Sequence, residues 1–280
     1  MDSHSPARSR LAVTALIVGC LGIAFAAAAA DHGQPLWLDL VTEDADAAAS
    51  FYRDLFGWEI VPGREADLLV RNGGHDIAAI YQISDEMPNA SESQWLVGIV
   101  TDDLDASVDA ARAAGGTVLR EITDVPGSGR YAVLRDPQGA VVLLGTPSRE
   151  LGGPRGPGNF VWAELWTDDL DGAARFYAKV LSYERSAVDR PGGSYAIFTA
   201  GGRPRAGLVE TPDPEVRPTW APYIAVSDLA ATVARVEALG GSVVIAPTPE
   251  FAGGRVALIA DPTQADLFIV QLPSDSEASK

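Results

Sequence analysis

The residues best suited to chemistry are two acids that each follow a tryptophan by two positions. Residues 37–52 read WLDLVTEDADAAASFY, and residues 162–177 read WAELWTDDLDGAARFY. Because side chains alternate along a strand, Asp39 and Glu164 are each expected on the same face as the preceding tryptophan. A carboxylate among indole rings can neutralise a cationic ligand, or act as a general base where burial raises its pKa.

The two acids lie in a tandem repeat with an offset of 125 residues. The matched pairs are Trp37 and Trp162, Asp39 and Glu164, Tyr52 and Tyr177, Arg130 and Arg255, and Asp136 and Asp261. We therefore predict two modules, at residues 35–146 and 160–272. Residues 147–159, PSRELGGPRGPGN, form a Pro/Gly-rich linker, and residues 273–280 form a polar tail.

Each module is itself expected to contain two similar units. In the first unit, residues 36–42 alternate as a strand, Thr42 is expected to cap a helix, and Gly57 ends that helix. Three short strand segments follow, so the unit is β-α-β-β-β. Two such units side by side can curl into a cup with helices outside, and the concave face is the natural ligand site. The predicted fold class is therefore α+β.

The sequence resembles the vicinal oxygen chelate superfamily, which includes glyoxalase I, bleomycin-resistance proteins and extradiol dioxygenases. The resemblance rests on the paired units, on the helix ends FYRDLFGW and FYAKVLSYE, and on RDPQGAVVLL near the end of the first module. It covers nearly all of residues 35–272. Its pattern W-x-[DE]-L-x-T-x-D is most similar to a bacterial branch of tandem-module proteins, and the fold hosts many chemistries.

The resemblance also implies where a metal would bind. Metal-using members hold the ion with His, Glu or Gln at positions that correspond here to Trp37, Gln94 and Leu143 in module 1, and to Trp162, Thr219 and Phe268 in module 2. Of these residues only Gln94 is a suitable ligand. The resemblance therefore implies that no metal cofactor is required.

The histidine and cysteine content favours the same conclusion. His75 is the only histidine inside either module, and it lies in an expected turn. We expect a solvated side chain there, and a lone general base is the alternative. Cys20, the only cysteine, lies before the modules. A nitrogen or thiolate site for zinc, iron or copper therefore cannot be assembled. An all-oxygen site for a divalent metal through Asp39 or Glu164 is the remaining alternative.

Two interpretations of the cup acids stay open. Arg130 and Arg255 are candidate partners on a neighbouring strand, and internal ion pairs would then fix the packing. Alternatively, each cup is a hydrated aromatic pocket that stacks on a planar or cationic small molecule. The candidate ligand-binding residues are Trp37, Asp39, Gln94, Arg130, Trp162, Glu164, Trp166, Tyr195, Thr219 and Arg255. Trp95 and Trp220 are also aromatic candidates, but we expect both in the core.

The N-terminal residues 1–30 indicate export. Two arginines precede the uncharged, mostly apolar run LAVTALIVGCLGIAFAAAAA. Cleavage after Ala30 is the favoured fate, and lipidation at Cys20 or retention as a membrane anchor are the alternatives. The body of the protein is expected outside the cytoplasm, touching a membrane only through this segment. The net charge of −17 argues against a nucleic-acid partner.

We therefore expect an exported protein that binds a small organic molecule for sequestration or resistance. A glyoxalase-type lyase, isomerase or oxygenase that uses a divalent metal is the competing hypothesis. A third possibility, a cell-surface interaction module, would have dry cups packed with side chains. Two modules in one chain can form a complete pseudo-twofold monomer, and a homodimer is the alternative.

Overall fold

The computed structural model describes residues 31–273 except 64–66, 86, 88–89, 191–192, 212–215 and 250. The predicted export segment, with Cys20, and nearly all of the predicted tail lie outside the described residues. Among the described residues, no helix is both long and apolar enough to cross a membrane.

The first module contains two β-α-β-β-β units in succession, as expected. Unit one consists of β1 (Pro35–Thr42), α1 (Ala45–Phe56), β2 (Glu59–Pro62), β3 (Leu68–Asn72) and β4 (His75–Gln82). Unit two consists of β5 (Gln94–Val100), α2 (Leu104–Ala113), β6 (Thr117–Val125), β7 (Gly129–Arg135) and β8 (Val141–Pro147).

The second module repeats this order with two short 3₁₀ helices added. Unit three consists of β9 (Phe160–Thr167), α3 (Leu170–Leu181), β10 (Glu184–Arg190), β11 (Gly193–Ala200) and β12 (Arg203–Glu210). Unit four consists of β13 (Thr219–Val226), α4 (Leu229–Val236), η1 (Glu237–Leu239), β14 (Ser242–Ile245), η2 (Ala252–Gly254), β15 (Val256–Ala260) and β16 (Asp266–Gln271).

Each module forms one mixed sheet of eight strands, which confirms the predicted α+β fold of paired units. The strand order is β2-β3-β4-β1-β5-β8-β7-β6 in module 1 and β10-β11-β12-β9-β13-β16-β15-β14 in module 2. The opening strands of the two units pair antiparallel at the centre of each sheet, β1 with β5 and β9 with β13. The central strands therefore carry the residues that face the middle of each cup.

The start of the first helix differs from the sequence prediction. The carboxylate of Asp44 caps α1 by accepting the backbone N–H of Ala47 at 2.9 Å, so Thr42 is not the cap. Thr42 instead contacts the other module, where its hydroxyl bonds that of Thr263 at 2.9 Å. Gly57 ends α1 in the left-handed conformation that favours glycine, as predicted.

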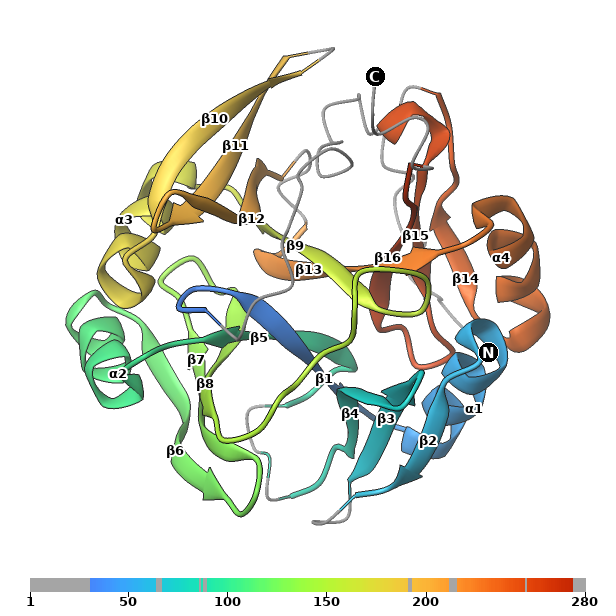
Figure 1. Ribbon diagram of the computed structural model, residues 1–280, viewed down its shortest axis with the longest axis horizontal. Helices are drawn as coiled ribbons and strands as arrows, with labels where there is room; N and C mark the ends of the chain where they lie inside the picture. The colour runs from blue at the N-terminus through green and yellow to red at the C-terminus, as the bar shows by residue number, and fades with distance from the viewer. Residues whose placement is uncertain are drawn as a thin grey trace, which may run out of the picture.

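The helices lie between the two sheets and join the modules. In Figure 1, α1 lies beside α4 on one side of the molecule and α2 lies beside α3 on the other. A single apolar core runs through these helices and the convex faces of both sheets. Trp95 and Trp220 belong to this core, where each indole N–H donates to a buried tyrosine hydroxyl, that of Tyr52 at 2.9 Å and that of Tyr177 at 2.8 Å.

Candidate functional site

The tryptophans and acids of the repeat face the cups, as their spacing predicts. In module 1 the indole N–H of Trp37 donates to Asp39 at 2.6 Å, and in module 2 Trp166 donates to Glu164 at 3.1 Å. These residues lie apart from the core between the modules, because the intervening residues, such as Leu38 and Leu165, point into it.

Strand pairing also brings the remaining predicted positions to the cup faces. Gln94 pairs with Val41 and Leu143 with Gly98 in module 1, while Thr219 pairs with Trp166 and Phe268 with Tyr223 in module 2. Paired residues on neighbouring strands share a face. Gln94 is half-buried and Thr219 is exposed, at the ends of their strands.

The cup of module 2 is closed around its acid. Glu164 is 1% exposed and accepts three hydrogen bonds, from Trp166 at 3.1 Å, from the Tyr195 hydroxyl at 2.5 Å and from the Tyr223 hydroxyl at 2.6 Å. The Tyr195 oxygen in turn accepts from the Trp162 indole at 3.2 Å. A buried carboxylate with this many donors has its hydrogen-bonding needs met within the protein.

Aromatic side chains fill the rest of this cup. Tyr223 and Phe268 stack with ring centres 4.6 Å apart, and Trp166 and Phe251 pack against Phe268. All of these rings are buried. This cup therefore has the dry, packed character that the interaction-module hypothesis assigned to both cups.

The acid of module 1 has a different environment. Asp39 keeps partial solvent exposure, and Trp37 is its only hydrogen-bond donor among the described residues. Protein atoms surround most of the carboxylate, and this desolvation raises its pKa to about 7 against the opposing effect of the Trp37 hydrogen bond. The nearby charge of Asp67 adds to the rise, while that of Arg120 opposes it.

Two of the residues that donate hydrogen bonds to Glu164 in module 2 have counterparts in module 1 that carry no such donor, and this explains part of the contrast. Tyr223 pairs with Trp162 across the sheet, and the residue that pairs with Trp37 in module 1 is Gly98. Gly98 has no hydroxyl to offer Asp39. The position of Trp166, two residues after the acid, is occupied by Val41 in module 1.

The third donor of module 2 is replaced by a like charge. Asp67 corresponds to Tyr195 in the pairing of the strands. In each module, the strand beside that of the cup acid pairs in turn with a third strand. Asp67 and Tyr195 each lie two residues before the residue of this third strand that is level with the acid. The two positions are 128 residues apart, so the 125-residue repeat does not align them. A second carboxylate near Asp39 disfavours its ionised form, whereas a tyrosine hydroxyl would stabilise it.

The predicted pairing of Arg130 with the cup acid is wrong. Arg130 donates to Asp105 of α2 at 2.7 Å, because alternation along β7 turns Tyr131 into the cup and Arg130 toward the helices. Arg255 is half-buried and directly precedes Val256, which packs in the cup of module 2.

Three residues that the sequence did not single out border the module 1 cup. Arg120 pairs with Val133, a cup residue of β7, and its charge reaches Asp39. Burial and the charge of Asp39 raise the pKa of Tyr131 to about 12, so this phenol stays protonated. The Arg149 guanidinium lies over the Trp37 ring, 5.9 Å from its centre. Alternation along β6 and β7 indicates the first two, but no sequence pattern indicates Arg149, which lies in the linker.

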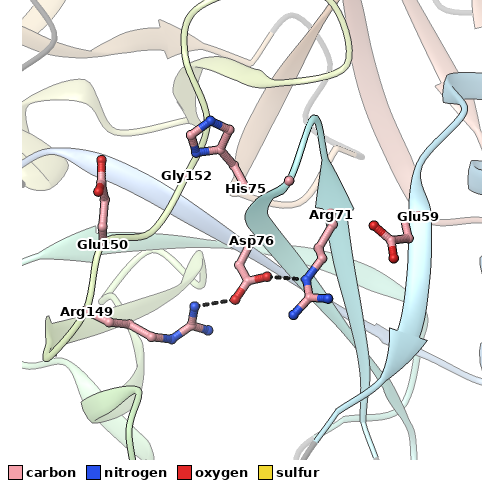
Figure 2. A pocket seen from close by; sticks show the side chains of 8 residues that line it. Glu59, Arg71, His75, Asp76, Arg149, Glu150 and Gly152 are labelled. Carbon is pink, nitrogen blue, oxygen red and sulfur yellow. Dashed lines mark hydrogen bonds and ion pairs between the residues drawn. The ribbon is translucent and has the colours of Figure 1, made fainter.

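A polar cavity of about 370 Å³ lies beside this cup. Its lining residues are Glu59, Arg71, Gly74, His75, Asp76, Arg149, Glu150 and Gly152. Figure 2 shows the Asp76 carboxylate between two guanidinium groups, those of Arg71 and Arg149. His75, the candidate lone base, is exposed at the start of β4. Burial disfavours the Asp76 charge, but the hydrogen bonds and charges of both arginines outweigh it and lower the pKa of Asp76.

The paired β-α-β-β-β units and cup-facing acids define a tandem glyoxalase-fold protein. The chain belongs to the Glyoxalase/Bleomycin resistance protein/Dioxygenase superfamily, whose family model matches residues 34–144 and 159–267. This result confirms the resemblance seen in the sequence.

Two curated relatives match along most of their length. The chain is 35% identical over 254 residues to the putative glyoxylase CFP32 of Mycobacterium tuberculosis, which covers 88% of this chain and 97% of the relative. It is 34% identical over 262 residues to the anthracycline biosynthesis protein DnrV of Streptomyces peucetius, with 86% and 94% covered.

Solved structures with the same fold share little sequence with this chain. A Mn(II)-bound glyoxalase from Novosphingobium aromaticivorans is 15% identical with a TM-score of 0.59, and 88% of this chain and 89% of that chain are covered. The halotolerant catechol dioxygenase BphC is 17% identical with a TM-score of 0.58, over 88% and 90%. At these identities the likeness establishes the fold alone.

The cup positions that the family resemblance assigns to a metal are poor in ligand atoms. Trp37, Gln94 and Leu143 are the module 1 residues at the positions where the family holds an ion, and two of them offer no ligand atom that a metal would take. The described part of the chain contains no cluster of three or more His, Cys, Asp or Glu side chains able to hold a metal ion.

Proposed function

We propose that the protein binds a small organic molecule in the module 1 cup without a metal, and that the module 2 cup serves packing. The observation that carries the proposal is the contrast between the two acids. Glu164 is satisfied by three donors inside the protein, whereas Asp39 has one donor and keeps partial exposure. An incompletely satisfied carboxylate beside an aromatic wall is suited to take up a ligand group.

The chemistry of the cup favours a planar ligand with a cationic or hydrogen-donating group. The partly buried rings of Tyr81 and Tyr131 can contact a planar group, and ionised Asp39 attracts a cation. Among the described residues, the module 1 cup cluster has four buried residues, whereas the module 2 cup cluster has twelve. A relative named for anthracycline biosynthesis supports planar polycyclic molecules as the first class to test.

A fluorescence titration with daunorubicin, a planar molecule that carries an amine, tests this proposal. Because the pKa of Asp39 is about 7, its ionised fraction grows between pH 6 and pH 7.5, so affinity is expected to rise over that range. Asp39→Asn is expected to weaken binding about tenfold at pH 7.5 and to abolish the rise, because a charge-assisted contact is lost.

The matched control is Asp109→Asn, because the Asp109 side chain is 79% exposed on α2, away from both cups. It is expected to bind as the wild type does. Absence of wild-type binding, or equal binding by Asp39→Asn, would contradict the assignment of the cup.

The competing enzyme hypothesis is favoured by one observation, the Asp39 pKa of about 7. A carboxylate with this pKa can remove a proton from a carbon beside a carbonyl group near neutral pH. Elemental analysis of the dialysed protein separates the hypotheses that involve a metal. Binding without a metal predicts far less than one divalent ion per chain, and near-stoichiometric metal would favour a metal-dependent enzyme of the glyoxalase type.

Export remains part of the proposal. Support comes from the apolar run after Arg8 and Arg10, and from the family match, which begins only at residue 34. N-terminal sequencing of the mature protein from a bacterial host is expected to start at residue 31. A lipid-modified Cys20 at the N-terminus, or an intact Met1 in the cytoplasm, would contradict cleavage after Ala30.

A further inference from the structure

We infer that the polar cavity beside the module 1 cup is a binding site for a small organic carboxylate, with Arg71 and Arg149 as its binding groups. This inference does not depend on the proposed function of Asp39. The cavity, of about 370 Å³, has the volume of a small-molecule site.

The two arginines are held in place by one carboxylate. Arg71 donates through Nε to Asp76 at 2.7 Å, and Arg149 donates through Nη1 to the other oxygen of the same group. Asp76 thus lies between the two guanidinium groups and fixes both (Figure 2). Its lowered pKa keeps it ionised, so it neutralises one of the two positive charges and leaves the other.

Both guanidinium groups retain donors that no other described residue uses. On Arg71 these are the N–H groups of both terminal nitrogens, and on Arg149 those of Nε and Nη2. An arginine presents its donors in a planar fork that matches a carboxylate in two-point contact. Two pre-oriented forks facing one cavity are therefore suited to a carboxylate.

With Glu59 and Glu150 counted, the cavity lining carries three carboxylates against two guanidinium groups, so the preference for an anion rests on the geometry of the two arginines. Glu59 and Glu150 are exposed, and water and salt screen exposed charges more than those of the partly buried Asp76 pair. Glu59 lies across the strand pair from Arg71 and raises its pKa slightly, without a hydrogen bond to it among the described interactions. These two acids are expected to weaken, not to reverse, anion binding.

The linker segment that carries Arg149 is fixed by contacts with the cup and with β4. Arg149 lies over the Trp37 ring, and Leu151, two positions after Arg149, packs in the same cup cluster as Trp37. The Gly152 N–H donates to the backbone oxygen of Asp76 at 2.9 Å and holds this segment against β4. The segment that carries Arg149 is thus held against both the cup and β4.

Calorimetric titration with benzoate tests the inference, with benzylammonium as the probe of opposite charge. Saturable benzoate binding is expected for the wild type. Arg71→Gln and Arg149→Gln are each expected to weaken it about tenfold or more, because each removes charge-assisted donors. Arg149→Lys keeps the charge but loses the fork, and is expected to weaken binding by a smaller factor.

Two further variants test whether the cavity prefers a negatively charged ligand and whether the loss of benzoate binding is specific to the cavity arginines. Glu150→Gln removes a negative charge from the lining and is expected to tighten benzoate binding. Arg130→Gln is the matched control, because Arg130 pairs with Asp105 away from the cavity, and it is expected to bind as the wild type does.

The inference is overturned if benzylammonium binds in place of benzoate, or if Glu150→Gln weakens benzoate binding. It is equally overturned if the arginine variants lower only the midpoint of thermal unfolding, since the arginines would then merely fasten the linker. Asp39→Asn separates this site from the cup, because it is expected to impair daunorubicin binding and to leave benzoate binding in place.

Discussion

At the scale of single residues, two equivalent acids differ because their neighbours differ. The sequence predicted correctly that Asp39 and Glu164 share the face of a tryptophan, since strand alternation is enough for that inference. It could not predict which acid is satisfied. That depends on Tyr195 and Tyr223, which reach Glu164 from other strands, and on a three-residue shift that hides the match between Tyr195 and Asp67.

The raised pKa of Asp39 predicts a dependence of stability on pH. The folded state keeps this group protonated up to a pKa of about 7, whereas the unfolded chain releases the proton near its ordinary value of 3.8. The folded state thus binds more protons at Asp39 between these values, so the contribution of Asp39 to stability is greatest below about pH 4 and falls as pH rises toward 7. The loss is at most about 4 kcal/mol for a three-unit shift.

Asp39→Asn is expected to remove this part of the pH dependence. The measurement is the free energy of unfolding in urea at pH 4.5 and pH 8 for the wild type and the variant. Asp136 and Asp261, whose pKa values are also raised by burial, are common to both proteins and cancel in the comparison. An identical pH dependence in the two proteins would show that Asp39 ionises at its ordinary pKa.

At the scale of elements, the repeated FY and DP motifs join the modules and do not line the cups. These motifs aligned the repeat in the sequence, and in the DP turn of module 1 the Gly139 N–H donates to the Asp136 backbone oxygen at 3.1 Å. The structure adds that Tyr177 donates to Asp136 at 3.1 Å from the other module. No single module contains this contact, so only the assembled sheets reveal it.

Phenylalanines of these motifs pack against glycines of the opposite module. A β-carbon at Gly241 would lie 2.7 Å from the Phe51 ring, and one at Gly116 would lie 2.9 Å from the Phe176 ring. Both glycines follow the ends of helices, Gly116 after α2 and Gly241 after η1. The close approach of a ring gives them a second role in the contact between α1 and the fourth unit, and between α3 and the second.

Gly241→Ala is therefore expected to destabilise the protein by about 1–3 kcal/mol through overpacking. Thermal or urea unfolding measures the loss. Gly156→Ala serves as the control, because a β-carbon there meets nothing within 4 Å, and it is expected to change stability little. Phe51→Leu combined with Gly241→Ala is expected to recover part of the loss, and an equal loss in both glycine variants would exclude the steric explanation.

At the scale of the whole molecule, the number of modules and units follows from the sequence, but the packing of the two modules around one core does not. The repeat predicted two cups, and the structure shows that their convex sides share one core. Hydrogen bonds also cross between the modules in matched positions, from Trp58 to the Gly158 oxygen at 2.7 Å and from Tyr183 to the Gly33 oxygen at 2.5 Å. The modules are therefore expected to unfold together.

Cutting the linker tests this union. A protease site inserted beside Arg155, which is exposed, would separate the chain into two fragments, one for each module. Because the helices and central strands of both modules share one apolar core, the fragments are expected to remain together on size exclusion and to unfold in one transition. The midpoint is expected to fall and to depend on concentration, since cleavage makes unfolding release two chains.

The same cleavage tests whether benzoate binding survives in the cut protein and what holds the two fragments together. Arg149 precedes the cut and belongs to the module 1 fragment, so benzoate binding is expected to persist while the fragments stay associated. Phe51→Ala with Phe176→Ala removes the two ring contacts between modules and is expected to let the cleaved fragments separate. Fragments that part without these substitutions, or unfold at two distinct temperatures, would show that each module is stable alone and that the shared core contributes little.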